Sequence, residues 1–175
     1  MLTSDSDWRG NYVDTASPVM TLRPKQELDY YDSRSITLPV AVTPLEAWNL
    51  MRSEPQPLMH LAFKARDAIS SLFGVKRIGG FSGARCDVAK VGDRLDFFLV
   101  EHVAADMLVL TERDRHLDVM ICLSTHGRSV TITASVFTHN AFGRLYMLPV
   151  GPAHKLIVHN DLRRLKRKVE TGMTQ

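Results

Sequence analysis

Three histidines are the residues best suited to acid–base chemistry, because imidazole changes its charge near neutral pH. His139, His154 and His159 lie in the stretch FTHNAFGRLYMLPVGPAHKLIVHNDL, with Arg144 and Tyr146 between the first two. An arginine or a tyrosine near a histidine is suited to holding an oxyanion or the carboxylate end of a ligand. Whether these side chains act together depends on the elements that carry them.

The last part of the chain predicts a helix that begins near Pro149 or Pro152 and ends at about Thr171. Its apolar residues recur at helical spacing and form one stripe that should face a sheet. The stripe consists of Val158, Leu162, Leu165 and Val169, with Ile157 at its edge.

This periodicity separates two of the histidines. His154 precedes Val158 by four residues, so it is expected to face the interior, either lining a cavity or bonded to a backbone carbonyl at the helix start. His159 lies about 100° away from the stripe and is expected to point toward solvent. Asp161 follows His154 by seven residues on the same edge of the helix, so both could reach one ligand.

His139 is placed by the strand that precedes it, predicted over residues 129–140. Apolar and hydroxyl side chains alternate along this strand, which predicts one buried face and one wetter face. The two sets are Val130, Ile132, Ala134 and Val136, and Thr131, Thr133 and Ser135. His139 falls on the wetter face, so we expect a structural role at the strand end. Arg144 and Tyr146 are expected either near a cavity mouth or bracing the turn.

The other candidate groups give weaker patterns. His116 and Asp118 stand two apart on a predicted strand, as an acid–base pair or as an exposed pair. The glycines of IGGFSGARC do not have phosphate-loop spacing, and neither cysteine, Cys86 or Cys122, belongs to a metal-ligand pattern. The sequence therefore predicts no metal and no cofactor.

Composition favours an ordinary globular protein. The chain has 175 residues, 45% of them hydrophobic, and a net charge of +3. Two cysteines suit a reducing compartment, and the polar N-terminus has no apolar signal core, so a cytoplasmic location is expected. No apolar run approaches the roughly 20 residues of a membrane span.

The remaining elements read in order along the chain. Residues 1–26 show no period and are expected to be a poorly ordered extension, followed by a single domain over 27–175. The stretch YYDSRSITLPV predicts a strand. Thr43, Pro44 and Glu46 predict a capped helix start, and a second helix is expected through LMHLAFKARDAISSLFG. Four antiparallel strands follow, namely RLDFFLVEHV, DMLVLTER, HLDVMICLST and SVTITASVFTHN. The fold class is therefore α+β, with a curved antiparallel sheet gripping the C-terminal helix.

Several stretches resemble an uncharacterised bacterial family of unknown function within the START and birch-pollen-allergen-like (SRPBCC, helix-grip) superfamily. They are YYDSRSITLP, LAFKARDAISSLFG, HLDVMICLS and THNAFGRLYMLPVGPAHKLIV. The resemblance implies a cavity between the sheet and the last helix, which members of the superfamily often use for lipids, sterols, polyketides or other apolar ligands. A few members are cyclases or hydrolases, but no residue of those activities can be matched here.

The leading expectation is a protein that binds a small apolar or amphipathic molecule, with His154, Arg144, Tyr146 and Asp161 as ligand-binding candidates. One alternative is a cyclase- or hydrolase-like enzyme with His154 as acid or base and Tyr146 or Arg144 holding an oxyanion. Another is a homodimer formed through strands that are apolar on both faces, such as DFFLV and DVMICL. The basic stretch DLRRLKRKVE is interpreted as a solvated helix face, with contact to an anionic membrane surface as the alternative. No nucleic acid is expected, because the stretch lacks interleaved aromatic residues.

Overall fold

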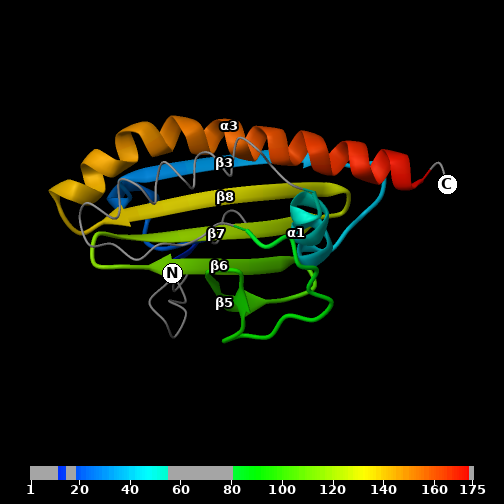
Figure 1. Ribbon diagram of the computed structural model, residues 1–175, viewed down its shortest axis with the longest axis horizontal. Coiled ribbons are helices and arrows are strands. Elements are labelled where there is room, and N and C mark those ends of the chain that lie inside the picture. The colour runs from blue at the N-terminus through cyan, green and yellow to red at the C-terminus, as the bar shows by residue number, and fades with distance from the viewer. Residues whose placement is uncertain (1–11, 15–18, 55–80, 174–175) are drawn as a thin grey trace, which may run out of the picture.

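The computed structural model describes residues 12–14, 19–54 and 81–173. Figure 1 shows an antiparallel sheet with one long helix, α3, running lengthwise along its β3 side. The strands of the main sheet follow the order β3-β8-β7-β6-β5-β4, and β1 pairs with β2 separately. The strands are β1 Tyr12–Asp14, β2 Val19–Thr21, β3 Tyr30–Thr37, β4 Arg94–Leu95, β5 Phe98–Val103, β6 Met107–Arg113, β7 Leu117–His126 and β8 Ser129–Thr138. The helices are η1 Lys25–Glu27, α1 Pro44–Arg52 and α3 Ala141–Gly172.

The predicted α+β class and helix-grip arrangement are confirmed by this architecture. The strands predicted over YYDSRSITLPV, DMLVLTER, HLDVMICLST and SVTITASVFTHN are present, and each pairs antiparallel with its neighbours. The single strand predicted over RLDFFLVEHV is wrong: Asp96 turns the chain with a φ of 57°, so this stretch forms the tight hairpin β4–β5, in which Arg94 pairs with Leu99. Gly127 forms the β7–β8 turn with a φ of 57°, a left-handed conformation that favours glycine. Short hairpins between β5, β6, β7 and β8 thus build most of the sheet from neighbouring parts of the chain.

Helix α1 begins where the sequence predicts. The Thr43 side chain accepts a hydrogen bond from the Glu46 backbone N–H at 3.2 Å, and the Thr43 N–H donates to the Glu46 carboxylate at 2.7 Å. This capping box satisfies two backbone donors at the helix start. The second predicted helix lies outside the described residues.

Helix α3 begins earlier than predicted. Asn140 caps it by accepting a hydrogen bond from the Gly143 N–H at 3.1 Å, so both prolines lie inside the helix. Pro149 and Pro152 cannot donate to the carbonyls four residues earlier, which belong to Leu145 and Leu148. The side chains of these two leucines are exposed, so water can satisfy the carbonyls on that face. Figure 1 shows a bend in the N-terminal third of α3, as expected where prolines interrupt a helix.

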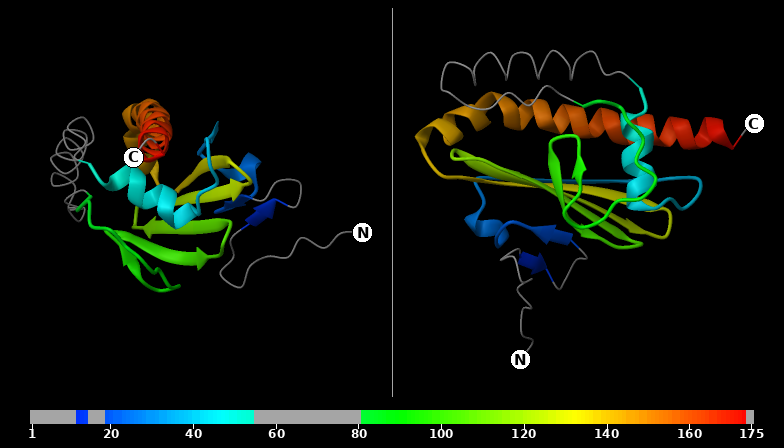
Figure 2. Two further views of the ribbon diagram at one scale, coloured as in Figure 1. Left: turned by 90° about the vertical axis from the view of Figure 1, so that its right-hand side faces the viewer. Right: turned by 60° about the horizontal axis from the view of Figure 1, so that its bottom comes forward.

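The N-terminal strand β2 covers the side of the sheet opposite α3, as Figure 2 shows. A second hydrophobic cluster forms there from Val19, Met20, Leu22, Val109, Met120 and Cys122. The Leu22 N–H donates to the Ser135 hydroxyl at 3.2 Å, and Ser135 and Thr133 are each 1% exposed. The face predicted to be wetter is therefore largely buried. Part of the expected N-terminal extension thus packs on the domain; residues 1–11 and 15–18 lie outside the described residues.

This packing also accounts for DVMICL, one of the two strands that are apolar on both faces. Val109 on β6 and Met120 and Cys122 on β7 turn away from α3 and meet β2 of the same chain. A second copy of the protein is not required to bury them. Within the described residues, no helix combines the length and apolarity needed to cross a membrane.

Candidate functional site

A cavity of about 250 Å³ lies between the sheet and α3. The lining extends along α3 from Phe142 to Asp161, which is about 28 Å of helix, so the cavity is elongated. Most lining side chains are apolar or aromatic. Those from the sheet include Leu117, Val119, Ile121, Leu123, Ile132, Ala134 and Val136, and those from α3 include Met147, Val150, Ala153, Ile157 and Val158.

An ion pair closes the end of the cavity next to α1. The Arg52 guanidinium donates to the Asp161 carboxylate at 2.7 Å, and the two side chains are only 10% and 3% exposed. The guanidinium carbon lies 4.2 Å from the ring centre of Phe81 and 5.1 Å from that of Trp48. Burial lowers the pKa of Arg52 from its ordinary value, and Asp161 opposes that shift. Because each charge satisfies the other, this end presents no net charge to a ligand.

Aromatic rings extend this end of the cavity into a cluster. Trp48 meets Phe81 and Phe98 edge to face, with ring centres 5.6 Å and 6.1 Å apart. Phe97 and Phe98 lie 4.4 Å apart. Such rings offer large apolar surfaces with few rotamers, which suits the binding of an apolar molecule.

His154 lies at the middle of the cavity. Its ring meets Tyr30 edge to face at 5.9 Å, and its buried Nδ1 has no hydrogen-bond partner among the described residues. Burial lowers the pKa of His154 to about 4, with Arg52 and Arg34 contributing and Asp32 opposing. The imidazole is therefore neutral at pH 7 and can offer a hydrogen bond without a charge.

Tyr30 lines the same part of the cavity, but its hydroxyl is already hydrogen-bonded to α3. Its hydroxyl donates to the Gly151 carbonyl oxygen at 3.2 Å, and burial raises its pKa to about 12. A side chain at position 151 would press on the Tyr30 ring at 3.2 Å, so glycine permits this close approach.

The opposite end of the cavity lies where the β6–β7 hairpin meets the start of α3. His116 packs against Phe142 with ring centres 4.6 Å apart, and its Nδ1 lies 3.3 Å from the Asn140 side-chain oxygen. The backbone N–H groups of His116 and Leu117 donate to Asp114 at 2.6 and 2.9 Å. Gly143 permits this arrangement, because an added Cβ would collide with the His116 carbonyl. These polar groups at this end of the cavity are thus already hydrogen-bonded to neighbouring residues of the hairpin and of the α3 N-cap.

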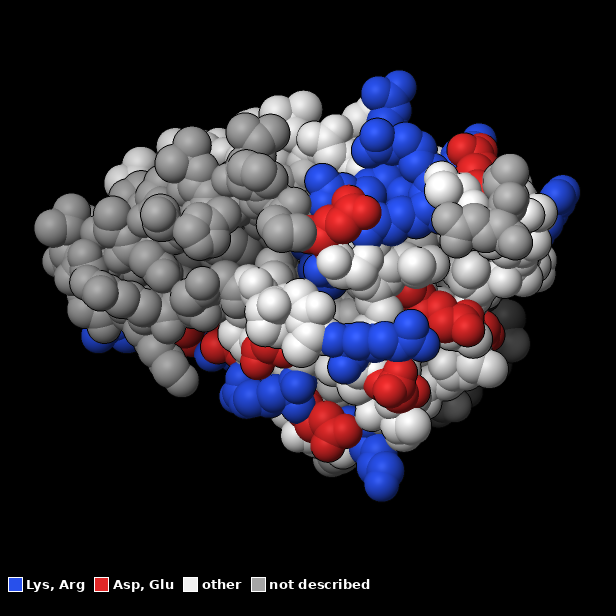
Figure 3. Space-filling model, turned by 45° about the vertical axis from the view of Figure 1, so that its right-hand side comes forward, with Lys and Arg blue, Asp and Glu red and all other residues white. Residues whose placement is uncertain are grey.

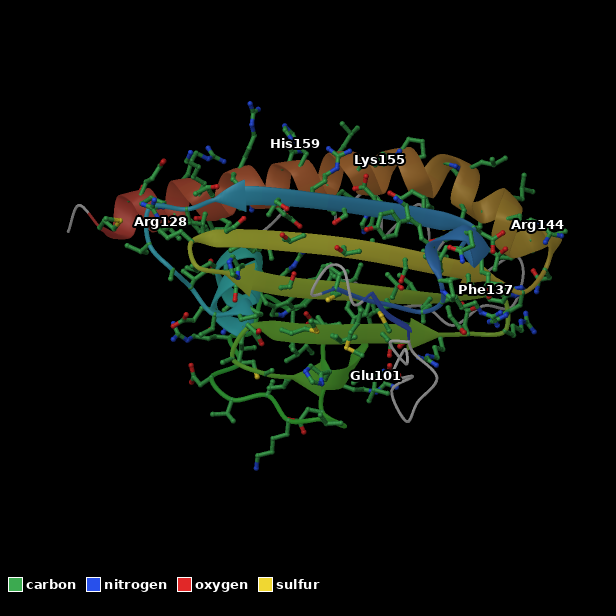
Figure 4. The ribbon with its side chains drawn as sticks, turned by 180° about the vertical axis from the view of Figure 1, so that it is seen from behind. Glu101, Arg128, Phe137, Arg144, Lys155 and His159 are labelled. Carbon is green, nitrogen blue, oxygen red and sulfur yellow. The ribbon has the colours of Figure 1, made fainter. Side chains whose placement is uncertain are left out.

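Three of the four ligand-binding candidates line the cavity. His154, Tyr146 and Asp161 belong to its lining, although Asp161 is already paired with Arg52. Arg144 is not part of the lining: its side chain is exposed at the start of α3, as Figure 4 shows. Helical spacing explains the difference, because Arg144 and Tyr146 lie about 80° from His154 on opposite sides of the helix. The lining residues Val150 and Ile157 lie on the Tyr146 side, so Arg144 falls outside the cavity.

The other histidines lie apart from His154. His159 is exposed on the outer side of α3, as periodicity predicts (Figure 4). His139 lies on the sheet face opposite the cavity, where its Nε2 is 3.0 Å from Asp118 and its ring meets Phe137 at 5.5 Å. His116 and Asp118 do not form an acid–base pair, because His116 lines the cavity while Asp118 pairs with His139.

Sequence reasoning missed Arg52, Trp48, Tyr30 and His116 as cavity residues. Trp48 and Arg52 are four apart, so their shared helix face could have been recognised. Nothing local indicates that Arg52 meets Asp161, because 109 residues separate them.

A family model described as "Protein of unknown function (DUF2867)" matches residues 25–160. No curated protein matches the chain. The matched range includes the sheet, α1 and the part of α3 that carries His154, but it ends just before Asp161.

Proposed function

The chain belongs to the DUF2867 family, whose description assigns no function, and we propose that it binds a small, elongated apolar or amphipathic molecule between the sheet and α3. The observation that carries this proposal is the apolar cavity of about 250 Å³. An apolar cavity of ~150 Å³ can bind benzene, so by proportion this one accommodates about ten non-hydrogen atoms.

The energetic cost of such a cavity supports a ligand. At ~24 cal/mol per Å³, an unfilled volume of 250 Å³ would cost up to about 6 kcal/mol. Domains are stable by only ~5–15 kcal/mol in total. A ligand that fills the cavity would recover much of this cost by contact with its apolar lining.

The polar groups narrow the class of ligand. The Arg52–Asp161 pair is internally neutralised, and His154 is uncharged at pH 7. A ligand with a hydroxyl or carbonyl group near its middle would supply a hydrogen bond to the buried imidazole. A ligand with a net charge in the cavity would have to lose its hydration, and the described residues offer it no free countercharge near His154. We therefore propose a neutral, weakly polar chain or ring system.

Binding is better supported than catalysis. A general acid must hold a proton that it can release at the working pH, and a pKa of about 4 leaves His154 without the imidazolium proton near neutrality. The neutral imidazole could act as a base, but a weak one, because its pKa lies well below neutral pH. Arg144, one of the two groups considered for an oxyanion, is exposed and outside the cavity lining.

The helix-grip arrangement also supports placing the chain in the START-like superfamily, as the sequence resemblance implies. In that superfamily the corresponding cavity often holds apolar ligands. We extend this ligand class to the present protein as part of the proposal. The expected cytoplasmic location and homodimer remain predictions.

Decan-1-ol is a suitable probe because its size is close to what the cavity volume admits and its single hydroxyl can form a hydrogen bond with His154. At a hundredfold excess over Kd, it should raise the free energy of unfolding by about 2.7 kcal/mol, measured by thermal shift and denaturant titration. Ethylene glycol is the polar control and should give no stabilisation. Native mass spectrometry of the full chain would report the stoichiometry.

Ala153→Phe tests whether the probe occupies this cavity, because Ala153 lines it from α3. The added ring should fill the cavity and abolish the decan-1-ol shift, while Ala153→Ser should keep it. Circular dichroism controls for folding. An undiminished shift in a folded Ala153→Phe variant, or no shift in the wild type with any alkanol from hexanol to dodecanol, would overturn the proposal.

A further inference from the structure

The outward face of α3 combines exposed leucines with basic residues that are not ion-paired to any residue that the structure describes. Leu145, Leu148 and Leu156 are 64%, 69% and 67% exposed. Their spacings of three and eight residues place them on one side of the helix, roughly opposite the cavity lining. Large apolar side chains grouped in this way on a protein surface mark an interaction site.

The same side becomes basic toward the C-terminus. Arg163 follows Leu156 by seven residues, and Arg167 follows after one more turn; both are exposed. Lys166 is also exposed on this side, and Lys155 flanks the leucines. Figure 3 shows the basic side chains gathered over the C-terminal part of α3.

The basic residues of α3 divide into two groups. Arg164 and Lys168 turn toward α1 and lie 3.9 and 3.3 Å from the Glu54 carboxylate. Arg163, Lys166 and Arg167 form no ion pair with any of the described residues. Packing and charge pairing within the domain therefore account for the first group but not for the second.

We propose that this face docks α3 lengthwise on an anionic lipid surface. From Leu145 to Arg167 the face extends about 33 Å, long enough for a helix lying parallel to the membrane. The leucines would enter the headgroup boundary while the basic end contacts anionic headgroups. The attraction of these cations for an anionic surface is the charge complementarity that identifies the partner.

A nucleic acid or a second copy of the protein would fit this face less well than an anionic membrane. A nucleic acid would favour aromatic side chains that stack on bases, whereas the outward side chains here are leucines. In a symmetric antiparallel dimer the leucine half of one copy would meet the basic half of the other. A parallel arrangement would bring like charges together.

Co-sedimentation with vesicles tests the proposal on the full chain. We expect binding to vesicles of phosphatidylcholine with phosphatidylserine, and little binding to phosphatidylcholine alone. The pair Arg163→Glu and Arg167→Glu should weaken binding by at least about thirtyfold, because each basic residue near an anionic surface contributes about fivefold. Arg85→Glu with Lys90→Glu makes the same change in net charge in the loop before β4, and it should leave binding unchanged.

A second variant tests the apolar half. Leu148→Gln with Leu156→Gln keeps residues of good helix propensity and should weaken binding by about tenfold, since less apolar surface is buried. The decan-1-ol shift should stay the same in both α3 variants, so docking and cavity binding are tested separately.

Four results would overturn the proposal. The first is equal binding to vesicles with and without phosphatidylserine. The second is a loss of vesicle binding in the Arg85→Glu, Lys90→Glu control as large as that in the Arg163→Glu, Arg167→Glu variant. The third is a dimer in sedimentation velocity that either α3 variant dissociates, which would assign the face to a second copy. The last is binding of a DNA or RNA oligonucleotide without binding to vesicles.

Discussion

His154 should make the free energy of unfolding depend on pH, and the substitution His154→Gln should remove this dependence. Its pKa is about 4 in the folded protein, against ~6.5 in an unfolded chain. The unfolded state therefore binds more protons between these values, and stability is lost as pH falls from about 6.5 toward 4. The full difference of about 2.5 pKa units corresponds to about 3 kcal/mol. By linkage, about 2 kcal/mol of this should be lost near pH 5.

Denaturant titrations near pH 7 and pH 5 would measure this loss. In His154→Gln the amide cannot take up a proton in this range, so the pH-dependent loss should shrink by about 2 kcal/mol relative to the wild type. His159→Gln is the matched control on the same helix, because it removes an exposed imidazole that lies outside the cavity. If His154→Gln and the wild type lost the same free energy between the two pH values, the neutral buried imidazole would be the wrong description.

Three further predictions concern groups around the cavity and in the sheet. Asp161→Asn should lower the free energy of unfolding by about 3–5 kcal/mol in denaturant titrations, because it leaves the Arg52 charge buried without its carboxylate. The double change Arg52→Met with Asp161→Leu should lower the free energy of unfolding by less. A larger loss in the double variant than in Asp161→Asn would contradict this account. Gly143→Ala should lower the free energy of unfolding by about 1–3 kcal/mol, because a Cβ would press on the backbone of the β6–β7 hairpin. Thermal unfolding would measure this loss, and an unchanged melting temperature would refute the prediction. Burial raises the pKa of the Cys122 thiol to about 11, so Cys122 should resist maleimide in the native protein. The half-buried Cys86 should react, and mass spectrometry would measure both labelling rates. Equal labelling rates for the two cysteines would contradict the packing of β2 over Cys122.

Much of the fold follows from local patterns. The alternation along residues 129–138 and the capping box at Thr43 depend on neighbouring residues, so both could be recognised without the structure. The inward position of His154 follows from its spacing to Val158, and the structure places it in the cavity lining.

Local rules misplaced the start of α3. Pro149 and Pro152 usually mark a boundary, yet the helix continues through both because it runs along the sheet and exposes the unpaired carbonyls to water. The capping residue Asn140 lies nine residues before the first proline, and its contact with the Gly143 N–H becomes visible only once the helix is in place.

The sequence by itself determined the order of elements, the helix-grip class and the side of α3 on which His154 lies, because these depend on spacing within single elements. Only the tertiary structure decided that Arg52 meets Asp161 and that β2 covers the far face of the sheet. These contacts join segments far apart in the chain, and their geometry depends on how the helix lies along the sheet. No local pattern encodes that placement, since it results from the packing of all the side chains between the two layers.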